Sequence, residues 1–412
     1  MVRNGAFPSR SFLLYWRANV VSSFGTYITL FALQALVVLT LHGSAAEVGW
    51  LNSVRWLPYL VVGVVVGALV DRRSRRPVMV MTDFVQAGLL ATIPLLWWVH
   101  WLSFPALLAI VLAYGTASVI NGAAEMSFLP RLVSREHLQR AHARGDGADA
   151  VAMTAGPAVA GLLVKVAGAP LAVLVDAAGY IYSAVTLRRI AVIEPAPTGD
   201  TRARDLVREI RDGVRWVYRG SGLTTLAVAT HVWFVGNAVV SVVVAPYALV
   251  MLGLTPFQFG LTGALGGVGA VAGAAVTTRV GLLLGTGRTI IAGDAISAVA
   301  VLVMVAAAAT KHTWLSVAVL GAGQGLYGLA LGMSNSHEMS YRQLVTPDEL
   351  QARTNTTLRS FNRAVMVIAA PLAGILADAW GIEPTFLVAA SIFAFVAGGL
   401  ALTSFRAVRA PI

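Results

Sequence analysis

Long runs of apolar residues, separated by short polar stretches, follow one another along nearly the whole chain. Each run is close to the roughly 20 residues that a helix needs to cross a bilayer. Because backbone polar groups in lipid must pair within their own segment, these runs predict helices. We therefore expect an all-α membrane protein with twelve transmembrane helices. The expected spans lie near 18–41, 46–70, 77–99, 104–128, 148–167, 170–187, 223–252, 257–280, 289–310, 313–336, 360–380 and 384–404.

Composition and charge agree with this class. The chain has 412 residues, of which 57% are hydrophobic and 12% charged, whereas soluble proteins carry about 25% charged residues. A net charge of +11 would suit nucleic acid, but Lys and Arg gather in the N-terminal segment, alternate loops and the C-terminal tail, with only Lys165 and Lys311 in the opposite loops. That asymmetry marks the cytoplasmic side. We expect no nucleic acid partner, no cleaved signal peptide, and both termini in the cytoplasm.

The sequence lacks the residues needed for disulfides, metal sites, nucleotide binding and catalysis. The chain has no Cys, which excludes disulfides and thiolate metal sites, and its seven His residues are scattered without ligand spacing. The sequence contains neither a phosphate-binding Gly-x-x-x-x-Gly-Lys-Ser/Thr motif nor a clustered nucleophile and base. We expect no cofactor, no metal and no enzymatic activity.

A break at 188–222 divides the apolar pattern. It holds an amphipathic stretch, Asp205 to Val217, which predicts a cytoplasmic helix along the membrane surface. We expect an N-terminal six-helix bundle over 1–187, a linker over 188–222 and a C-terminal six-helix bundle over 223–412.

The two halves repeat one another. Glu47-Val-Gly49 matches Gln258-Phe-Gly260 at an offset of 211, and Glu125-Met-Ser-Phe128 matches Glu338-Met-Ser-Tyr341 at 213. A nearly constant offset indicates a duplicated, pseudo-symmetric six-helix unit, which is the layout of a two-bundle transporter.

The loop between the second and third expected spans concentrates charge. It carries Gly67, Asp71, Arg72, Arg75 and Arg76, with Asp83 further along. On these residues the chain resembles the major facilitator superfamily, and within it the bacterial exporter branch of enterobactin-type siderophore and macrolide efflux proteins. Ser74 departs from the Gly that many members have there.

A second element supports the same resemblance. Gly156-Pro157-Ala-Val-Ala160-Gly161 in the fifth span is similar to an antiporter-associated Gly-Pro element, with Ala160 replacing one Gly. The second-half copy of the charged loop is degenerate, because Thr277 stands where Asp71 would be. The resemblance implies the major facilitator fold in a bacterial inner membrane, and proton antiport.

Asp71 has two interpretations. Arginines alone would satisfy the topology rule, so the loop can be a solvated marker of orientation. The resemblance instead implies a cytoplasmic gate, in which Asp71 meets the positive start of the eleventh helix near Thr357.

Polar residues recur on one face of several spans at three- and four-residue spacing. They either form interhelical hydrogen bonds, worth about 0.6 kcal/mol on average, or line a water-accessible substrate path. These candidates are Thr26 and Gln34 in the first span, Tyr114, Asn121 and Glu125 in the fourth, His231 and Asn237 in the seventh, and Gln324, Tyr327, Asn335 and Glu338 in the tenth.

Two charges lie well inside spans, Arg55 and Asp176. Each is costly unless it is paired or faces water. Arg55 either binds an anionic group or pairs with Asp176. The titratable candidates for proton coupling are Asp176, His231, Glu125 and Glu338, although a lone His in an apolar span is more often a hydrogen-bonded structural residue.

These observations favour a monomeric secondary transporter whose partners are the lipid bilayer, a small-molecule substrate and protons. The sparse polar lining favours export of a hydrophobic or amphipathic molecule, such as a drug, siderophore or secondary metabolite. The alternatives are an importer of a small nutrient with the same fold, or a non-transporting sensor or membrane enzyme.

Overall fold

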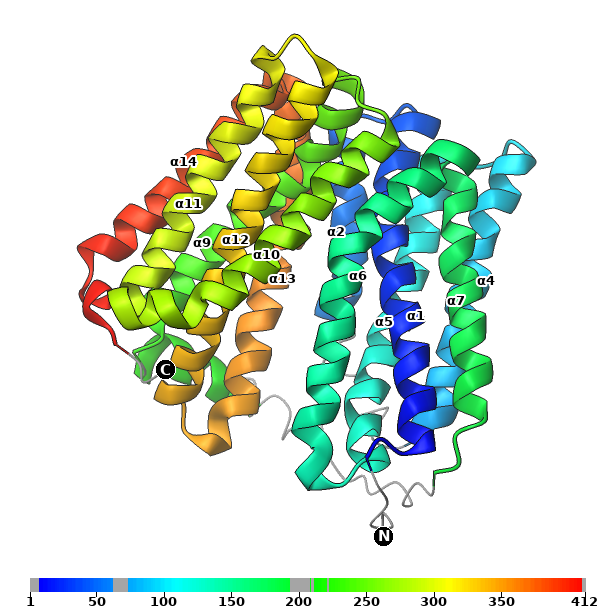
Figure 1. The fold of residues 1–412 in the computed structure, drawn as a ribbon, viewed down its shortest axis with the longest axis horizontal. Helices are drawn as coiled ribbons and strands as arrows, with labels where there is room; N and C mark the ends of the chain where they lie inside the picture. Colours follow the sequence, from blue (N-terminus) through cyan, green and yellow to red (C-terminus); the bar gives the residue numbers. More distant parts are fainter. Residues whose placement is uncertain (1–6, 62–72, 193–207, 209–210, 221, 410–412) are drawn as a thin grey trace. The chain divides into compact units, whose positions relative to one another are not determined.

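The computed structural model describes residues 7–61, 73–192, 208, 211–220 and 222–409, and every regular element in these ranges is helical (Figure 1). Eleven of the described helices are long and apolar enough to cross a membrane. The predicted all-helical membrane class is therefore confirmed. The expected span near 46–70 is described only as far as Val61, so the count of twelve stays a prediction.

The chain divides into two compact units. Unit 1 holds residues 1–42 and 54–200, and unit 2 holds residues 43–53 and 201–412. The division at 188–222 stays a prediction. Unit 1 contains α1 (Arg10–Ala35), the later part of α2 (Ala45–Val61), α4 (Arg75–Trp98), α5 (Phe104–Leu132), α6 (Leu138–Ala167) and α7 (Ala169–Arg188). Unit 2 contains the start of α2, α9 (Thr224–Pro246), α10 (Pro256–Leu284), α11 (Thr286–Ala306), α12 (Thr313–Val345), α13 (Gln351–Trp380) and α14 (Ile382–Leu402).

Several helices extend beyond the apolar runs that predicted them. Helix α6 begins at Leu138 rather than near 148, and its first turns carry Arg140 and Arg144. Helix α13 begins at Gln351, so the expected helix start near Thr357 is wrong: Thr357 lies buried inside α13. Hydropathy marks only the residues suited to lipid, whereas polar residues can continue the same hydrogen-bonded helix into water.

The same local devices recur in the two units. Helix α1 continues into a π-helical turn at Leu36–Thr40 and α9 into another at Tyr247–Met251, 211 residues later. Gly168 and Gly381, 213 residues apart, precede α7 and α14 with φ of 85° and 94°, a conformation that glycine adopts without steric cost. These offsets match those of the sequence repeat.

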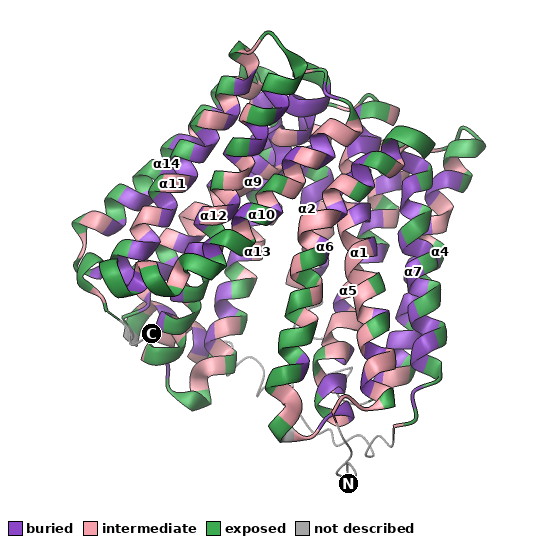
Figure 2. Cartoon of the chain, viewed as in Figure 1, coloured by how far each residue is buried: buried purple, intermediate pink, exposed green. Residues whose placement is uncertain are grey.

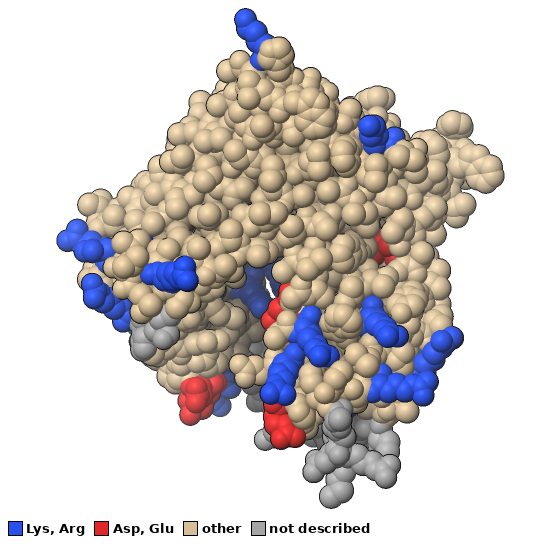
Figure 3. All heavy atoms as spheres, in the orientation of Figure 1, with Lys and Arg blue, Asp and Glu red and all other residues tan. Residues whose placement is uncertain are grey.

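Each helix has one face inside its unit. Figure 2 shows buried and exposed positions alternating along the same helices. Outward positions are often large and apolar, such as Leu283 at 80% and Leu402 at 89% exposure. Apolar surface of this extent suits contact with lipid. In unit 1 basic side chains gather at the end that carries the N-terminus, below a broad uncharged band (Figure 3).

Helices α10 and α12 approach so closely that their backbones nearly touch. A Cβ added at Gly269 would lie 1.9 Å from the carbonyl oxygen of Gly325, and one at Gly328 would lie 2.0 Å from that of Gly266. The equivalent of Gly328 in unit 1 is Gly115, whose added Cβ would keep 3.1 Å from the Arg55 carbonyl. Small residues permit this approach in membrane helices. The contact at Gly328 in unit 2 is closer than the equivalent contact at Gly115 in unit 1.

The first turn of α2 is fastened to α13 within unit 2. The backbone N–H groups of Ala45 and Ala46 donate to the Asp378 carboxylate at 3.0 and 3.1 Å. A Cβ added at Gly374 would lie 2.3 Å from the Ala45 carbonyl oxygen. Asp378 thus satisfies two N–H groups that the start of a helix leaves without a helical partner.

Within the predicted linker, the structure describes a helical stretch over 211–215 and a π-helical turn at Trp216–Gly220. The expected position of this helix along the membrane surface stays a prediction, but its last apolar residue packs inside unit 2. Val217 is fully buried and packs with Ala227 of α9 and Leu358 of α13. Asp212 also receives a bond from Arg353 of α13 at 3.3 Å. This segment is therefore part of the packing of unit 2.

Candidate functional site

A cavity of about 390 Å³ lies within unit 1. It is bounded by α1, the later part of α2, and α4 to α7. Five predicted path residues line it: Thr26, Arg55, Tyr114, Asn121 and Glu125. Aromatic side chains form much of the remaining lining, and these are Tyr27, Trp56, Tyr59 and Tyr180. The structure thus brings together candidates that lie up to 99 residues apart in the sequence.

The carboxylates of this cavity meet hydroxyl groups. Tyr15 donates to Glu125 at 2.9 Å, and Tyr27 donates to Asp149 at 3.1 Å. Within the described ranges, neither carboxylate forms an ion pair. Among the described contacts, Glu125 therefore has a hydroxyl partner and no arginine partner.

Asn121 connects the cavity to a buried acid behind it. Its side-chain amide donates to Asp83 at 2.6 Å and to Thr82 at 2.8 Å, which joins α5 to α4. Asp83 is 3% exposed and accepts a hydrogen bond from this amide. Asn121 thus lines the cavity and forms interhelical hydrogen bonds, and a role in a substrate path stays a prediction.

The suggested pair between Arg55 and Asp176 does not form. Asp176 is fully buried and accepts a bond of 2.6 Å from Thr29. The Arg55 guanidinium carbon lies 4.6 Å from the centre of the Trp56 ring, in a cation–π arrangement, and Arg55 faces the cavity. The apolar runs of the sequence placed both charges inside spans. The rotation of each helix decides which partner a side chain reaches.

A second cavity, of about 310 Å³, lies within unit 2 between α9, α11, α12 and α13. The predicted residues Asn335 and Glu338 line it. Glu338 accepts a 2.6 Å bond from Arg342 one turn along α12, and Thr230 donates to it at 3.3 Å. The cavity also carries Asp294 and Arg359. Glu125 and Glu338 are repeat equivalents, yet only Glu338 has a cation bonded to it among the described residues.

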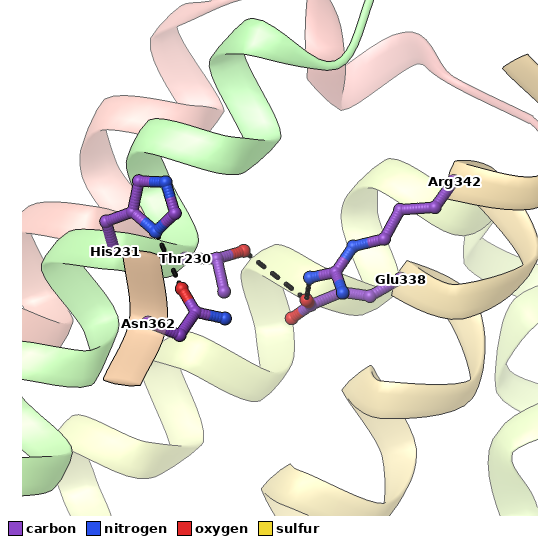
Figure 4. A network of polar contacts seen from close by, with 5 residues as sticks. All are labelled: Thr230, His231, Glu338, Arg342 and Asn362. Atoms are coloured by element: carbon purple, nitrogen blue, oxygen red, sulfur yellow. Dashed lines mark hydrogen bonds and ion pairs between the residues drawn. The ribbon is translucent and has the colours of Figure 1, made fainter. Parts of the chain in front are cut away.

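His231 takes part in a hydrogen-bonded chain at the edge of this cavity (Figure 4). Its Nδ1 lies 2.6 Å from Oδ1 of Asn362, and its Nε2 lies 2.6 Å from the Tyr218 hydroxyl. Because Oδ1 can only accept, Nδ1 donates, and in the neutral tautomer Nε2 then accepts from Tyr218. Burial raises the pKa of Tyr218, outside the spans, above its usual value. His231 is thus hydrogen-bonded on both ring nitrogens, as the structural interpretation expected.

Other predicted path residues form interhelical hydrogen bonds. Tyr327 donates to Asn237 at 2.8 Å, and Gln324 donates to Thr262 at 2.8 Å. These three predicted residues, like the half-buried Gln34, line neither of the two cavities described above. For them the described contacts fit the first alternative, hydrogen bonding between helices.

The predicted gate falls partly outside the described residues. Gly67, Asp71 and Arg72 lie there, so their role stays a prediction. Arg75 is buried at the start of α4, and Arg76 donates to the carbonyl of Ile190, just past α7, at 2.6 Å.

The Gly-Pro element lies at a helix contact of unit 1. A Cβ added at Gly156 would lie 2.6 Å from Cβ of Tyr27, so glycine allows α6 to approach α1. Pro157 sits inside α6 without ending it. The element therefore positions Tyr27, the donor to Asp149.

Sequence reasoning missed three polar residues that the structure makes prominent: Asp149, Arg342 and Asp378. Asp149 lies at the start of the expected span 148–167 and was not considered separately. Arg342 was counted as a loop charge. A search for acids within four residues of a span end would have found Asp149 and Asp378. Among the described residues, no group of three or more His, Asp or Glu side chains is placed to hold a metal ion.

The sequence matches the family model described as Major Facilitator Superfamily over residues 16–363. The chain belongs to this superfamily. It is therefore a transporter of the major facilitator type and a multi-pass membrane protein, and the resemblance inferred from the charged loop is confirmed.

Curated relatives agree. An uncharacterised MFS-type transporter of Sinorhizobium fredii is 27% identical over 350 residues, which cover 83% of this chain and 82% of the relative. Macrolide efflux protein A of Streptococcus pyogenes is 25% identical over 226 residues, 52% of this chain and 53% of that protein. The multidrug efflux pump Tap of Mycobacterium tuberculosis is 28% identical over 219 residues, 51% of each. The two efflux proteins thus match over about half of their length.

The fold has solved counterparts. The crystal structure of a point mutant of the nucleoside transporter NupG superposes with a TM-score of 0.78 over 95% of this chain and 99% of that one, at 11% identity. At this identity the likeness establishes the fold alone.

Proposed function

We propose that this chain is a secondary active exporter of a hydrophobic or amphipathic small molecule, driven by proton entry and working by alternating access. Similarity to a macrolide efflux protein and a multidrug efflux pump supports the direction of transport. The observation that carries the proposal is the lining of the unit 1 cavity, in which aromatic rings outnumber charged groups.

That lining favours an apolar cargo for a physical reason. Tyr and Trp offer large apolar faces with a polar edge, and they stabilise bound rings and alkyl groups mainly by burying area. Binding sites for drug-sized molecules combine such walls with a few placed polar groups. Here the charged groups are Arg55, Glu125 and Asp149, and uncharged polar side chains such as Ser23, Thr26 and Gln86 lie beside them.

Glu125 is our proposed proton-carrying group. Glu125 faces the cavity and accepts a hydrogen bond from the neutral Tyr15 hydroxyl. Protonation of Glu125 therefore removes a negative charge that has no cation bonded to it among the described residues. Its equivalent Glu338 is held by Arg342, and protonation there would leave the arginine without its counter-ion. Removing one partner of a buried ion pair is costly. The two halves therefore differ, and coupling is assigned to unit 1.

The proposal includes the gate and the topology that the sequence predicts. Asp71 and its arginines control the cytoplasmic side, and the second span completes a set of twelve helices in two six-helix bundles. The protein acts as a monomer in a bacterial inner membrane, with both termini in the cytoplasm. Because the natural chain has no Cys, single cysteines placed in successive loops and labelled with an impermeant maleimide test this topology directly.

The function is tested by measuring the accumulation of a panel of hydrophobic and amphipathic compounds in cells with and without the protein. We expect lower accumulation in expressing cells for at least one compound, and loss of the difference with a protonophore. Higher accumulation in expressing cells would reverse the direction in favour of the importer. A difference that survives the protonophore would exclude proton drive.

Two matched variants test the coupling residue. In Glu125→Gln we expect protonophore-sensitive export to fall at least tenfold, which is about 1.4 kcal/mol of lost driving interaction, with unchanged protein in the membrane. In Glu338→Gln we expect a smaller loss of export and a lower melting temperature, because Arg342 loses its partner. Equal export by Glu125→Gln and the natural protein would exclude Glu125 as the coupling group.

A further inference from the structure

A groove of about 580 Å³ runs along the outer surface of unit 1, away from the cavity described above. Six residues at the start of α4 and one at the end of α7 line it: Arg76, Pro77, Val80, Met81, Phe84, Val85 and Arg188. It therefore combines an apolar trough with two guanidinium groups from neighbouring helices.

The apolar part of the groove faces outward. Met81, Phe84 and Val85 are 55%, 37% and 45% exposed, and their spacing places them on one side of α4. One turn further, a Cβ added at Gly88 would meet nothing within 4 Å. The trough thus continues along α4 into open space. The outward apolar side chains in this region suit contact with lipid tails.

The two arginines lie at one end of that trough. Arg188 is exposed, and its guanidinium carbon lies 4.9 Å from the centre of the Phe84 ring. Arg76 reaches from α4 to the carbonyl of Ile190, just past the end of α7. The side chains cross between the helix ends, so both positive groups border the same space.

We propose that this groove binds an anionic phospholipid, with the phosphate between Arg76 and Arg188 and an acyl chain along Met81, Val85 and Gly88. Guanidinium groups match phosphate oxygens in geometry and charge. Basic pockets between helices at the cytoplasmic side of a membrane suit such headgroups. A zwitterionic lipid would bring its own cation to the arginines and lose this complementarity.

The sequence repeat supplies a natural control. Arg76 corresponds to Arg288 at an offset of 212, but α7 and α14 align at 213, the offset of Gly168 and Gly381, so Arg188 corresponds to Ala401. Unit 2 therefore keeps one exposed arginine at the start of α11 and has an alanine in place of the second. The arginine pair is therefore not repeated at these two positions of unit 2.

The test is native mass spectrometry of the full-length protein, released from detergent after incubation with phosphatidylglycerol or phosphatidylcholine. We expect the natural protein to retain phosphatidylglycerol preferentially. Arg188→Gln should weaken that retention roughly five- to tenfold, Arg188→Lys should restore most of it, and Arg288→Gln should leave it unchanged.

Three outcomes would overturn the proposal. If the natural protein retained the two lipids equally, the charge of the headgroup would not be the basis of lipid binding at this groove. This comparison needs only the natural protein. An equal loss in Arg188→Gln and Arg288→Gln would show a general effect of surface charge. Full displacement of phosphatidylglycerol by an equimolar amount of inorganic phosphate would assign the site to a free anion instead of a lipid.

Discussion

The close contact between α10 and α12 makes a quantitative prediction for Gly269→Ala. The added Cβ would lie 1.9 Å from the carbonyl oxygen of Gly325, whereas such contacts need about 3 Å. The neighbouring atom belongs to the backbone, so the two helices must separate locally by about 1 Å. Overpacking of this kind costs about 1–3 kcal/mol. At about 2–4 °C per kcal/mol for a unit near 200 residues, the melting temperature should fall by roughly 2–12 °C.

The matched control is Gly398→Ala in α14, where an added Cβ meets nothing within 4 Å. There the substitution should be neutral or stabilise the helix by up to about 1 kcal/mol, because alanine has the higher helix propensity. Melting is best followed by intrinsic fluorescence of the ten Trp residues, since the chain has no Cys for thiol-reactive dyes. An unchanged melting temperature in Gly269→Ala, or equal losses in both variants, would refute the reasoning.

Three further predictions concern single polar groups. Asp378→Ala should lower stability by about 0.5–2 kcal/mol, because the start of α2 loses its acceptor, while Asp378→Asn should lose less; equal melting temperatures of all three proteins would contradict this. Tyr218→Phe should cost about 1 kcal/mol through the lost bond to His231, and the loss should disappear in a His231→Phe background if the two groups act as a pair. Asp71→Asn should lower export while the amount of protein in the membrane stays normal, and normal export by a well-inserted variant would count against the gate.

Much of this architecture follows from one-dimensional properties of the chain. The length of an apolar run and the absence of charge within it decide that a segment becomes a membrane helix, because lipid offers no partner for a free backbone group. The family resemblance was likewise recognised from a local motif, the Arg-flanked Asp71. The near-constant repeat offset also anticipated that Leu36–Thr40 and Tyr247–Met251 would be equivalent, although it did not indicate that both would be π-helical.

The candidate site depended on relations that no local pattern contains. Helical periodicity correctly placed Tyr114, Asn121 and Glu125 on one face, because that face is a property of one helix. It could not show that Asp176 meets Thr29 while Arg55 lies over Trp56, since those contacts depend on how each helix is rotated and shifted against its neighbours.

The same limit separates the two halves of the repeat. Glu125 and Glu338 stand in matching sequence contexts, and spacing alone treats them alike. Only the tertiary structure places a tyrosine hydroxyl against one and an arginine against the other. Side-chain partners are chosen by packing between helices, whereas the sequence pattern describes each helix alone.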